Sequence, residues 1–544
     1  MWNRDFCQQS DDPHNDHDFG QGESTLSAGI YLHTVYTRRE PGTRRIIMIT
    51  MCSRIAEYRP LPVGSAMRVP SADGCCRTRR NCGCLYTVHG CLIRELGFPL
   101  ALSGVTPIIR RVLDIKLFRE KPDHVRERLA ARGAGDEARV GEILAADEQR
   151  RKLLVELETL KAQRNRVSKE IGALMAQKKS AEAEDRKRET REMGEKISQL
   201  EADVNAVDRQ RDALMLQVPN LPHHSVPLGK SSEDNPVLRT FGEKPTFDFK
   251  PRTHVELCEQ LKLVDFTRAA KLSGSGFLLY TGWGARLERA LIQFLLDLHT
   301  LEHGYTEVSP PFVVGPQCLE GVGQFPKFKD QYYGLAEGDN TAELGKLYLI
   351  PTAETPVANI HREEILKESQ LPIRYCAYTP CFRGEAGAAG VGTRGMIRVH
   401  QFDKVELIKI VKPEDGNAEH EKMLENAERV LQLLGLHYRV VTLCTGDMGF
   451  ASAKTFDIEV WAPGQGSYLE VSSVSNCEDF QARRMNTRFK SESGENRFPH
   501  ILNGSGTALA RLFVALLETC QQADGSIVIP GPLEAYLNRD RIPA

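Results

Sequence analysis

The segment CFRGEAGAAGVGTRGMIRVHQFDKVE, residues 381–406, combines the side chains that a nucleotide-binding site needs. Paired guanidinium donors suit phosphate oxygens, an aromatic face suits a purine ring, and carboxylates accept hydrogen bonds from amines and hydroxyls. The segment therefore predicts a site that holds a nucleotide beside a small polar molecule. The side chains concerned are Arg383, Glu385, Arg398, Phe402 and Glu406.

A β-hairpin is the element that must position these side chains. The Gly-rich middle of the segment predicts the loop, and Arg383 and Glu385 fall on the strand before it. Arg398, Phe402 and Glu406 fall on the strand after it and are separated by even steps. Because hairpin strands are antiparallel and side chains alternate between faces, these three should share one face. For Arg-x-Glu alone, the commoner explanation is an exposed charged hairpin.

The complete string resembles motif 2 of the class II aminoacyl-tRNA synthetases, which reads Phe-Arg-x-Glu, a loop, then Arg-x-x-x-Phe. Its continuation RGMIRVHQFDKVE is similar to the form found in the seryl-tRNA synthetase family. The resemblance covers residues 112–544, and it includes the phrases PNLP and VPLG near residues 219–229.

Two further segments resemble the other class II motifs. NGSGTALARLFVALLE, residues 503–518, predicts a Gly-rich turn followed by a helix with Arg511 on its first turns, where anions are favoured. This segment is similar to motif 3, whose arginine contacts the tail of ATP. HGYTEVSPPFVV, residues 303–314, follows a helical pattern over 287–301 and is similar to motif 1, which forms the interface of a homodimer.

The resemblance also implies an amino-acid pocket and an ATP site. Pro351-Thr352-Ala353-Glu354 matches a serine-binding loop, and Glu470-Val471-Ser472-Ser473 matches an ATP-binding strand. The implied serine-binding residues are Thr352, Ala353, Glu354, Glu406, Asn503 and Ser505. The implied ATP-binding residues are Arg383, Gly384, Glu385, Val399, Phe402, Glu470, Val471, Ser472, Ser473 and Arg511.

Three of these residues are implied to be catalytic, namely Arg383, Glu470 and Arg511. Glu470 is also the implied ligand of a Mg²⁺ ion that arrives with ATP. Gly384 departs from the family pattern, since many relatives have Ser or Arg there, and we expect it to change the stiffness of the loop.

A long helical hairpin is predicted ahead of these motifs. Two sets of apolar residues recur at spacings of three, four and seven, with a polar turn near 178–184 between them. Helices of roughly 30 residues would give an arm on the order of 45 Å long. The apolar residues are Leu153, Leu157, Leu160, Val167, Ile171 and Leu174, followed by Met193, Ile197, Leu200, Val204, Val207 and Leu214.

The charge of this hairpin bears on its role. Residues 149–196 contain 14 Lys and Arg against 9 Asp and Glu, although the whole chain has a net charge of −2. Such a surplus suits contact with an RNA backbone, while a spacer with a solvated charged face remains the alternative. The arm resembles the tRNA-binding domain of bacterial-type seryl-tRNA synthetases, which grips the long variable arm of the tRNA.

Length and composition predict a protein of several domains, and the resemblance implies an α+β fold. The expected fold is an antiparallel β-sheet core of class II type flanked by helices (223–544), preceded by the coiled-coil arm domain (112–222). No apolar run in the 544 residues reaches the roughly 20 residues of a membrane span. The seven cysteines after residue 222 show no paired pattern, which favours reduced thiols and a cytoplasmic location.

Residues 1–111 show no sustained period and hold the other seven of the 14 cysteines. A zinc ribbon would need a second cysteine pair at suitable spacing, and none follows. Members of the seryl family typically begin Met-Leu-Asp, and here the resemblance starts at Val112-Leu113-Asp114. We therefore expect Val112 to be the initiator, read from a GUG codon, and residues 1–111 to be an unstructured or spurious extension.

The function that the resemblance implies is the ATP-dependent attachment of L-serine to the 3′ end of tRNA(Ser) through a seryl-adenylate, with selenocysteine tRNA as a second acceptor. Three alternatives stay open at this point. They are a related ligase that loads an amino acid onto a carrier protein, a binding module descended from a synthetase, and a coiled-coil scaffold.

Overall fold

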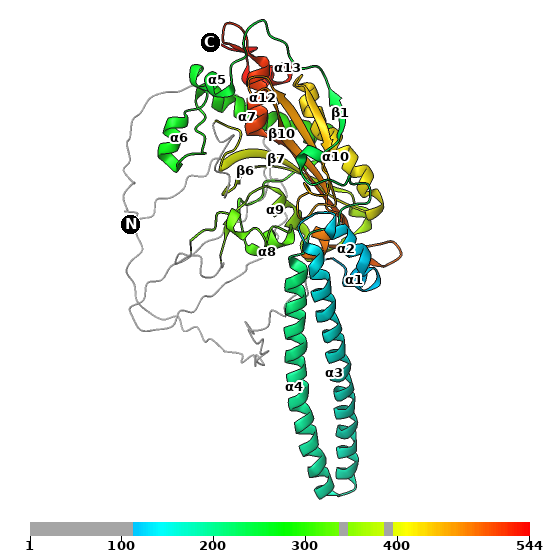
Figure 1. Ribbon diagram of the computed structural model, residues 1–544. Coiled ribbons are helices and arrows are strands. Elements are labelled where there is room, and N and C mark those ends of the chain that lie inside the picture. The colour runs from blue at the N-terminus through cyan, green and yellow to red at the C-terminus, as the bar shows by residue number, and fades with distance from the viewer. Residues whose placement is uncertain (1–112, 337–345, 386–394) are drawn as a thin grey trace, which may run out of the picture. The chain divides into compact units, whose positions relative to one another are not determined.

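The computed structural model describes residues 113–336, 346–385 and 395–544 (Figure 1). The expectations for residues 1–111 and for the Gly-rich loop at 386–394 lie outside the described residues. In the described part, no helix combines the length and apolar character that crossing a membrane requires.

An eight-stranded sheet forms the centre of the catalytic part (Figure 1). Neighbouring strands are antiparallel, which confirms the predicted core, except that the short edge strand β2 runs parallel to β6. In spatial order the strands are β1 (Val237–Phe241), β8 (Tyr438–Thr442), β9 (Lys454–Ala462), β10 (Ser467–Asn476), β13 (His500–Ala508), β7 (Gln401–Val411), β6 (Ile373–Phe382) and β2 (Thr306–Glu307).

Helices pack on this sheet because their apolar residues recur at helical spacing. Leu509, Leu512, Phe513 and Leu516, the four residues whose spacing predicted a helix, are all fully buried. The main packing helices are α7 (Gly282–Asp297), α10 (Gly416–Leu433), α12 (Leu509–Cys520) and α13 (Gly531–Leu537).

Shorter elements surround the sheet. The remaining helices of the catalytic part are α5 (His254–Gln260), α6 (Phe266–Ser273), α8 (Pro316–Gly321), α9 (Glu354–Ala358) and α11 (Phe480–Met485). The remaining strands are β3 (Val313–Val314), β4 (Tyr348–Leu349), β5 (Ile365–Lys367), β11 (Arg488–Lys490), β12 (Asn496–Arg497), β14 (Ile527–Val528) and β15 (Arg541–Ile542).

The structure corrects the predicted limits of the hairpin. β6 ends at Phe382, so Arg383 and Glu385 lie just beyond it, and β7 begins at Gln401, so Arg398 precedes it. Arg398 therefore does not share a strand face with Phe402 and Glu406. The even spacing was wrong for Arg398 because alternation holds only while the backbone stays extended and paired.

The predicted Gly-rich turn at 503–508 is instead the end of strand β13. Its glycines let neighbouring side chains lie close to the strand backbone. A Cβ at Gly504 would lie 3.0 Å from the sulfur of Met423, and one at Gly506 would lie 2.7 Å from Nε2 of His299. Glycine inside a strand commonly marks such contacts. The helix itself begins at Leu509, so Arg511 is on its first turn as predicted.

The arm consists of α3 (Arg139–Ala176) and α4 (Ser180–Leu216), which run side by side (Figure 1). The 38 residues of α3 span about 57 Å at 1.5 Å per residue, which is longer than expected because the helix starts well before the first heptad. Heptad residues such as Leu157 and Ile197 are buried between the helices. Lys161 and Glu201 form an ion pair across them at 3.0 Å.

The root of the arm is joined to the catalytic part through a buried arginine. Helices α1 (Ile115–Glu120) and α2 (Pro122–Ala130) precede Arg132, which is only 9% exposed. Its guanidinium donates to four backbone carbonyls at 2.6–3.2 Å. Burial lowers the pKa of Arg132 to about 10. The acceptors are the carbonyls of Asn220, Met448, Gly449 and Ser452.

Replacing this guanidinium should be costly. We expect Arg132→Met to lower the free energy of unfolding by about 3 kcal/mol, because buried carbonyls lose their donors. Urea unfolding followed by circular dichroism measures the change. Arg188→Met on the arm is a suitable control, because Arg188 and its partner Asp185 are both 73% exposed, and should change stability by less than about 0.5 kcal/mol. Equal losses in the two variants would contradict the anchoring role of Arg132.

Candidate active site

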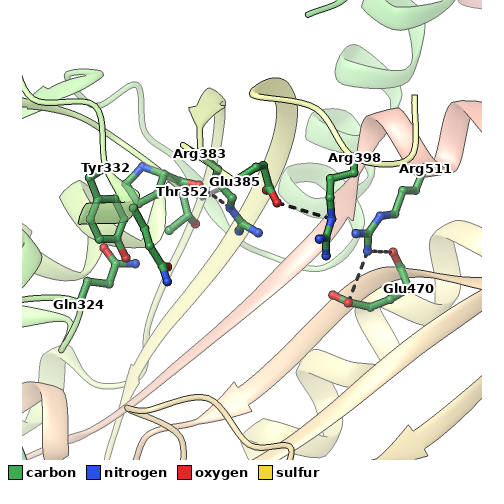
Figure 2. Close-up of a pocket in the computed structure, with 10 residues that line it drawn as sticks. Gln324, Tyr332, Thr352, Arg383, Glu385, Arg398, Glu470 and Arg511 are labelled. Carbon is green, nitrogen blue, oxygen red and sulfur yellow. Dashed lines mark hydrogen bonds and ion pairs between the residues drawn. The ribbon is translucent and has the colours of Figure 1, made fainter. Parts of the chain in front are cut away.

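Three guanidinium groups line one cleft beside the strands of the central sheet (Figure 2). They belong to Arg383, Arg398 and Arg511, which come from three separate segments of the chain. The cleft has a volume of about 520 Å³. Three cations around one open volume create a strong site for a polyanion. The other lining residues are Gln324, Gln331, Tyr332, Pro351, Thr352, Glu385 and Glu470.

Arg383 is held at the end of β6 by backbone contacts. Its amide donates to the carbonyl of His400 at 2.9 Å, and its Nε donates to the carbonyl of Pro351 at 3.4 Å. The guanidinium carbon lies 5.2 Å from the ring centre of Phe402, within the range of a cation–π contact.

Arg511 points across the cleft to Glu470 (Figure 2). It donates from Nη1 to the carbonyl of Glu470 at 2.8 Å, approaches the carboxylate at 3.4 Å, and donates from Nε to the carbonyl of Ile397 at 3.1 Å. Glu470 lies at a register shift of β10, which turns its side chain toward the cleft. Arg398 pairs with Glu385 at 3.5 Å. Each arginine that faces the cleft is thus oriented by groups of another segment.

A smaller hollow with apolar walls adjoins the three arginines. The segment Met396–Val399 forms one side, and Phe402, Val471 and Ala508 form others. Apolar walls next to a cluster of cations suit a flat heterocycle that carries phosphates. Val399 and Val471, both predicted at the nucleotide, lie here, and Ser505 also reaches this hollow.

A buried charge pair lies on the floor beside the cleft. The carboxylate of Glu406 pairs with the ammonium of Lys404, and it accepts a hydrogen bond from Oγ1 of Thr352 at 3.2 Å. Lys404 also donates to Thr352 Oγ1 at 2.7 Å. Lys404 was missed from the sequence, although it lies two residues before Glu406 and so on the same strand face. Its even spacing from Phe402 and Glu406 was the signal that could have identified it.

A second carboxylate, that of the half-buried Glu354, lines an adjoining hollow and lacks a cationic partner in direct contact among the described residues. Its Oε1 accepts hydrogen bonds from Gln481 at 2.7 Å and from Asn503 at 3.2 Å. Burial, and then the negative charge of Glu406, raise the pKa of Glu354 to about 7. A carboxylate in this condition favours a positively charged ligand.

Some predicted residues do not reach the cleft. Ala353 is fully buried, Ser472 donates to the carbonyl of Ser505 at 2.5 Å, and Ser473 lies opposite Asp457 of β9. Gly384 donates from its amide to the carbonyl of Gln331 at 2.9 Å, and a Cβ there would lie 3.0 Å from that oxygen. A side chain at 384 would thus press on the backbone near Gln331. The sequence reasoning also missed Gln324, Gln331, Tyr332 and Gln481.

No cluster of three or more metal-binding side chains occurs among residues 113–336, 346–385 and 395–544. Glu470 alone offers a half-exposed carboxylate to the cleft. Mg²⁺ in nucleotide sites is commonly held by one or two carboxylates together with substrate phosphates and water. The donor set therefore fits a magnesium ion that arrives with a nucleotide better than one caged by protein.

Family models match two parts of the chain. One is described as the seryl-tRNA synthetase N-terminal domain and matches residues 112–222, and the other as the tRNA synthetase class II core domain (G, H, P, S and T) and matches residues 337–520. The chain is 52% identical to the serine–tRNA ligase of Akkermansia muciniphila over 431 residues, which are 79% of this chain and 99% of that protein. It is 51% identical to the serine–tRNA ligase of Carboxydothermus hydrogenoformans, with the same shares covered.

Two solved structures from the same family also match the chain. The crystal structure of seryl-tRNA synthetase from Pyrococcus horikoshii complexed with ATP matches with a TM-score of 0.74 at 41% identity, covering 79% of this chain and 100% of that one. The cytoplasmic serine–tRNA ligase from Naegleria fowleri in complex with AMP matches with a TM-score of 0.70 at 30% identity, covering 80% and 99%.

The raised pKa of Glu354 predicts a dependence of stability on pH. Between about pH 4.5 and pH 7 the unfolded chain has released this proton while the folded chain still holds it, so the free energy of unfolding falls as pH rises through that window. Glu354→Gln keeps an acceptor for Gln481 and Asn503 but cannot ionise. We expect the free energy of unfolding of the wild type to fall by on the order of 3 kcal/mol across this pH window, and the variant to lack this fall.

Urea unfolding at pH 5 and pH 8 measures this difference. Glu425→Gln, a change at an exposed glutamate of α10, is the matched control and should follow the wild type. A Glu354→Gln variant with the same pH dependence as the wild type would show that Glu354 ionises normally in the folded protein.

Proposed function

The chain belongs to the seryl-tRNA synthetase family of class II aminoacyl-tRNA synthetases, and from this premise we propose that it charges tRNA(Ser) with L-serine through a seryl-adenylate. The observation that carries the proposal is the meeting of three guanidinium groups around one cleft, where the lining residue Thr352 hydrogen-bonds the buried carboxylate of Glu406 and the carboxylate of Glu354 lines an adjoining hollow. The cations suit the phosphates of ATP, and the carboxylates suit the ammonium and hydroxyl of serine.

In the first step the carboxylate oxygen of serine attacks the α-phosphorus of ATP. A bond forms from that oxygen to phosphorus, the bond from the α-phosphorus to the bridging oxygen breaks, and pyrophosphate leaves with the electron pair. Arg383 orients the α-phosphate against the serine carboxylate, and Arg511 binds the terminal phosphates. Catalysis of this kind depends on positioning and charge neutralisation rather than covalent chemistry by the protein.

Serine is recognised on the floor of the site. The carboxylate of Glu406 accepts a hydrogen bond from the serine hydroxyl, and the hydroxyl of Thr352, which bonds Glu406, can donate to it. Lys404 balances the negative charge of Glu406. Glu354 receives the ammonium group. A site built to hydrogen-bond a hydroxyl can reject an analogue that lacks it, such as alanine, by about 10⁴–10⁵ because its buried polar groups would stay unpaired.

Magnesium enters this proposal as a partner of ATP. Glu470 is the residue that would hold it, and the ion would supply charge neutralisation at the phosphates. In this structure Arg511 lies 3.4 Å from the Glu470 carboxylate.

The seryl group then passes to the 3′ end of tRNA(Ser), which the arm holds. Arg166, Lys169 and Lys178 on the arm are exposed and make no ion pair with any acidic side chain in the described part of the chain, so they are available to phosphates. Other basic residues, such as Arg150, are already paired within the arm. We extend the proposal to selenocysteine tRNA as a second acceptor, and to a homodimer formed through the segment that contains α7 and β2.

Glu406→Ala tests the amino-acid site. We expect serine-dependent exchange of pyrophosphate into ATP to fall by about 10²–10³-fold, because a buried charged hydrogen-bonding group is lost and Lys404 is left unpaired. Glu425→Ala on α10 should keep wild-type exchange. Full exchange by Glu406→Ala would remove Glu406 from serine recognition, and absence of exchange by the wild type would end the proposal.

Shortening the arm separates activation from transfer. Deletion of residues 161–203 removes the distal arm near the Lys161–Glu201 contact and leaves the root in place. We expect unchanged pyrophosphate exchange and loss of charging of total tRNA by more than about 100-fold, since the phosphate contacts disappear. Retained charging would show that the arm is a spacer. A ligase for a carrier protein would show exchange without tRNA charging in the intact chain as well.

A further inference from the structure

A buried histidine lies behind the wall of the apolar hollow that adjoins the three arginines. His254, the first residue of α5, is 1% exposed, and its Nε2 accepts a hydrogen bond from the backbone amide of Met396 at 3.3 Å. Met396 belongs to the segment 396–399 that forms one side of the hollow. His254 does not itself line any part of the cleft, so it can affect the site only through that backbone.

The partners of His254 determine which ring nitrogen carries the proton. Since the Met396 amide is a donor, Nε2 must be the unprotonated nitrogen, and Nδ1–H then donates to Glu518 Oε1 at 2.9 Å. Glu518 is fully buried and receives further N–H donors from the backbone of His254 at 2.8 Å and from Gln465, through its backbone and side chain, at 3.1 Å each. This arrangement fixes both the tautomer and the orientation of the imidazole.

The backbone just before the segment 396–399 lies so close to the imidazole of His254 that only glycine fits at residue 395. Gly395 has a φ of +87°, and a Cβ there would lie 2.3 Å from Nε2 of His254 and 2.7 Å from a methyl carbon of Val255. Behind Met396, whose side chain is fully buried, the thiol of Cys258 lies 3.9 Å from its sulfur. Helix α5 thus contacts this wall through His254, Val255 and Cys258.

We propose that His254 is a positioning residue for the nucleotide, and that it acts through the Met396 amide to hold the wall against the heterocycle of ATP. This inference rests on the proposed function, because it assigns the hollow to the nucleotide of that reaction. Among the described residues the segment 396–399 makes no hydrogen bond or ion pair to Thr352, Glu354 or Glu406, so we expect serine recognition not to depend on His254.

Two substitutions separate the contact of Nε2 with Met396 from the contact of Nδ1 with Glu518; Gln465 Nε2 also lies 3.3 Å from Nδ1. The amide of Gln extends about as far as Nε2 and can accept from Met396, whereas the amide of Asn extends about as far as Nδ1 and can donate only to Glu518. We expect His254→Asn to raise the KM for ATP about tenfold in serine-dependent pyrophosphate exchange, with the KM for serine within twofold of the wild type. His254→Gln should keep the KM for ATP within about threefold.

A purely structural histidine would behave differently. It would give equal effects in the Asn and Gln variants, or a parallel change in both KM values, and either result overturns the inference. If His254→Asn does not fold, Gly395→Ala provides the same test with His254 in place, because the new Cβ must push the wall away from the ring. Its KM for ATP should rise while its KM for serine stays the same, and an unchanged KM for ATP refutes the proposal.

Exchange by the wild-type protein distinguishes this inference from the proposed function. If the wild type catalyses exchange and the His254 and Gly395 variants keep its KM for ATP, only the role of His254 is refuted. Absence of wild-type exchange would refute the proposed function, and the inference that rests on it would fall with it.

Discussion

The register of β7 between β6 and β13 is the constraint on which the site depends. Glu406 lies opposite Ala377 on one side and Ser505 on the other, so three strands meet at one row of the floor. A slip of one residue would turn Lys404 and Glu406 to the opposite face. That face carries Val405 and Leu407, which are fully buried in the main hydrophobic core. The free energy of burying these two side chains therefore also fixes the positions of the neighbouring charged residues, Lys404 and Glu406.

Burial of like charges is the second constraint. The negative charge of Glu406 opposes the ionisation of Glu354, and in the described part of the chain only Glu406 of these two has a cation in direct contact, from Lys404. The effect appears as a raised pKa for Glu354. A ligand with one ammonium group and one hydroxyl relieves this condition, because the ammonium supplies the missing positive charge at Glu354. A ligand without an ammonium would leave Glu354 to bind a proton instead.

The sequence predicted the chemistry of the site better than its backbone. Arg383, Arg398 and Arg511 were identified from motifs and do share one cleft, and the helix at Leu509 followed from its spacing. The strand limits were wrong at Arg398, and a strand was taken for a turn at 503–508, because glycine content alone does not distinguish a turn from a close contact. His254 could not have been found, since its partners Met396 and Glu518 are 142 and 264 residues away and no local pattern records such a contact.

Backbone acceptors explain how the arm is fixed to the catalytic part without matched side chains. Arg132 donates to carbonyls of residues 448–452, and the Asn220 amide donates to the carbonyls of Ala451 and Cys477 at 3.0 and 2.9 Å. A carbonyl is present whatever residue occupies its position, so substitutions on the acceptor side cannot remove these bonds. Cys477 also connects to Glu354, because Asn503 donates to the sulfur of Cys477 and to the carboxylate of Glu354. The arm root and Glu354 are therefore joined through Cys477, whose carbonyl accepts from the buried Asn220 and whose sulfur accepts from the half-buried Asn503.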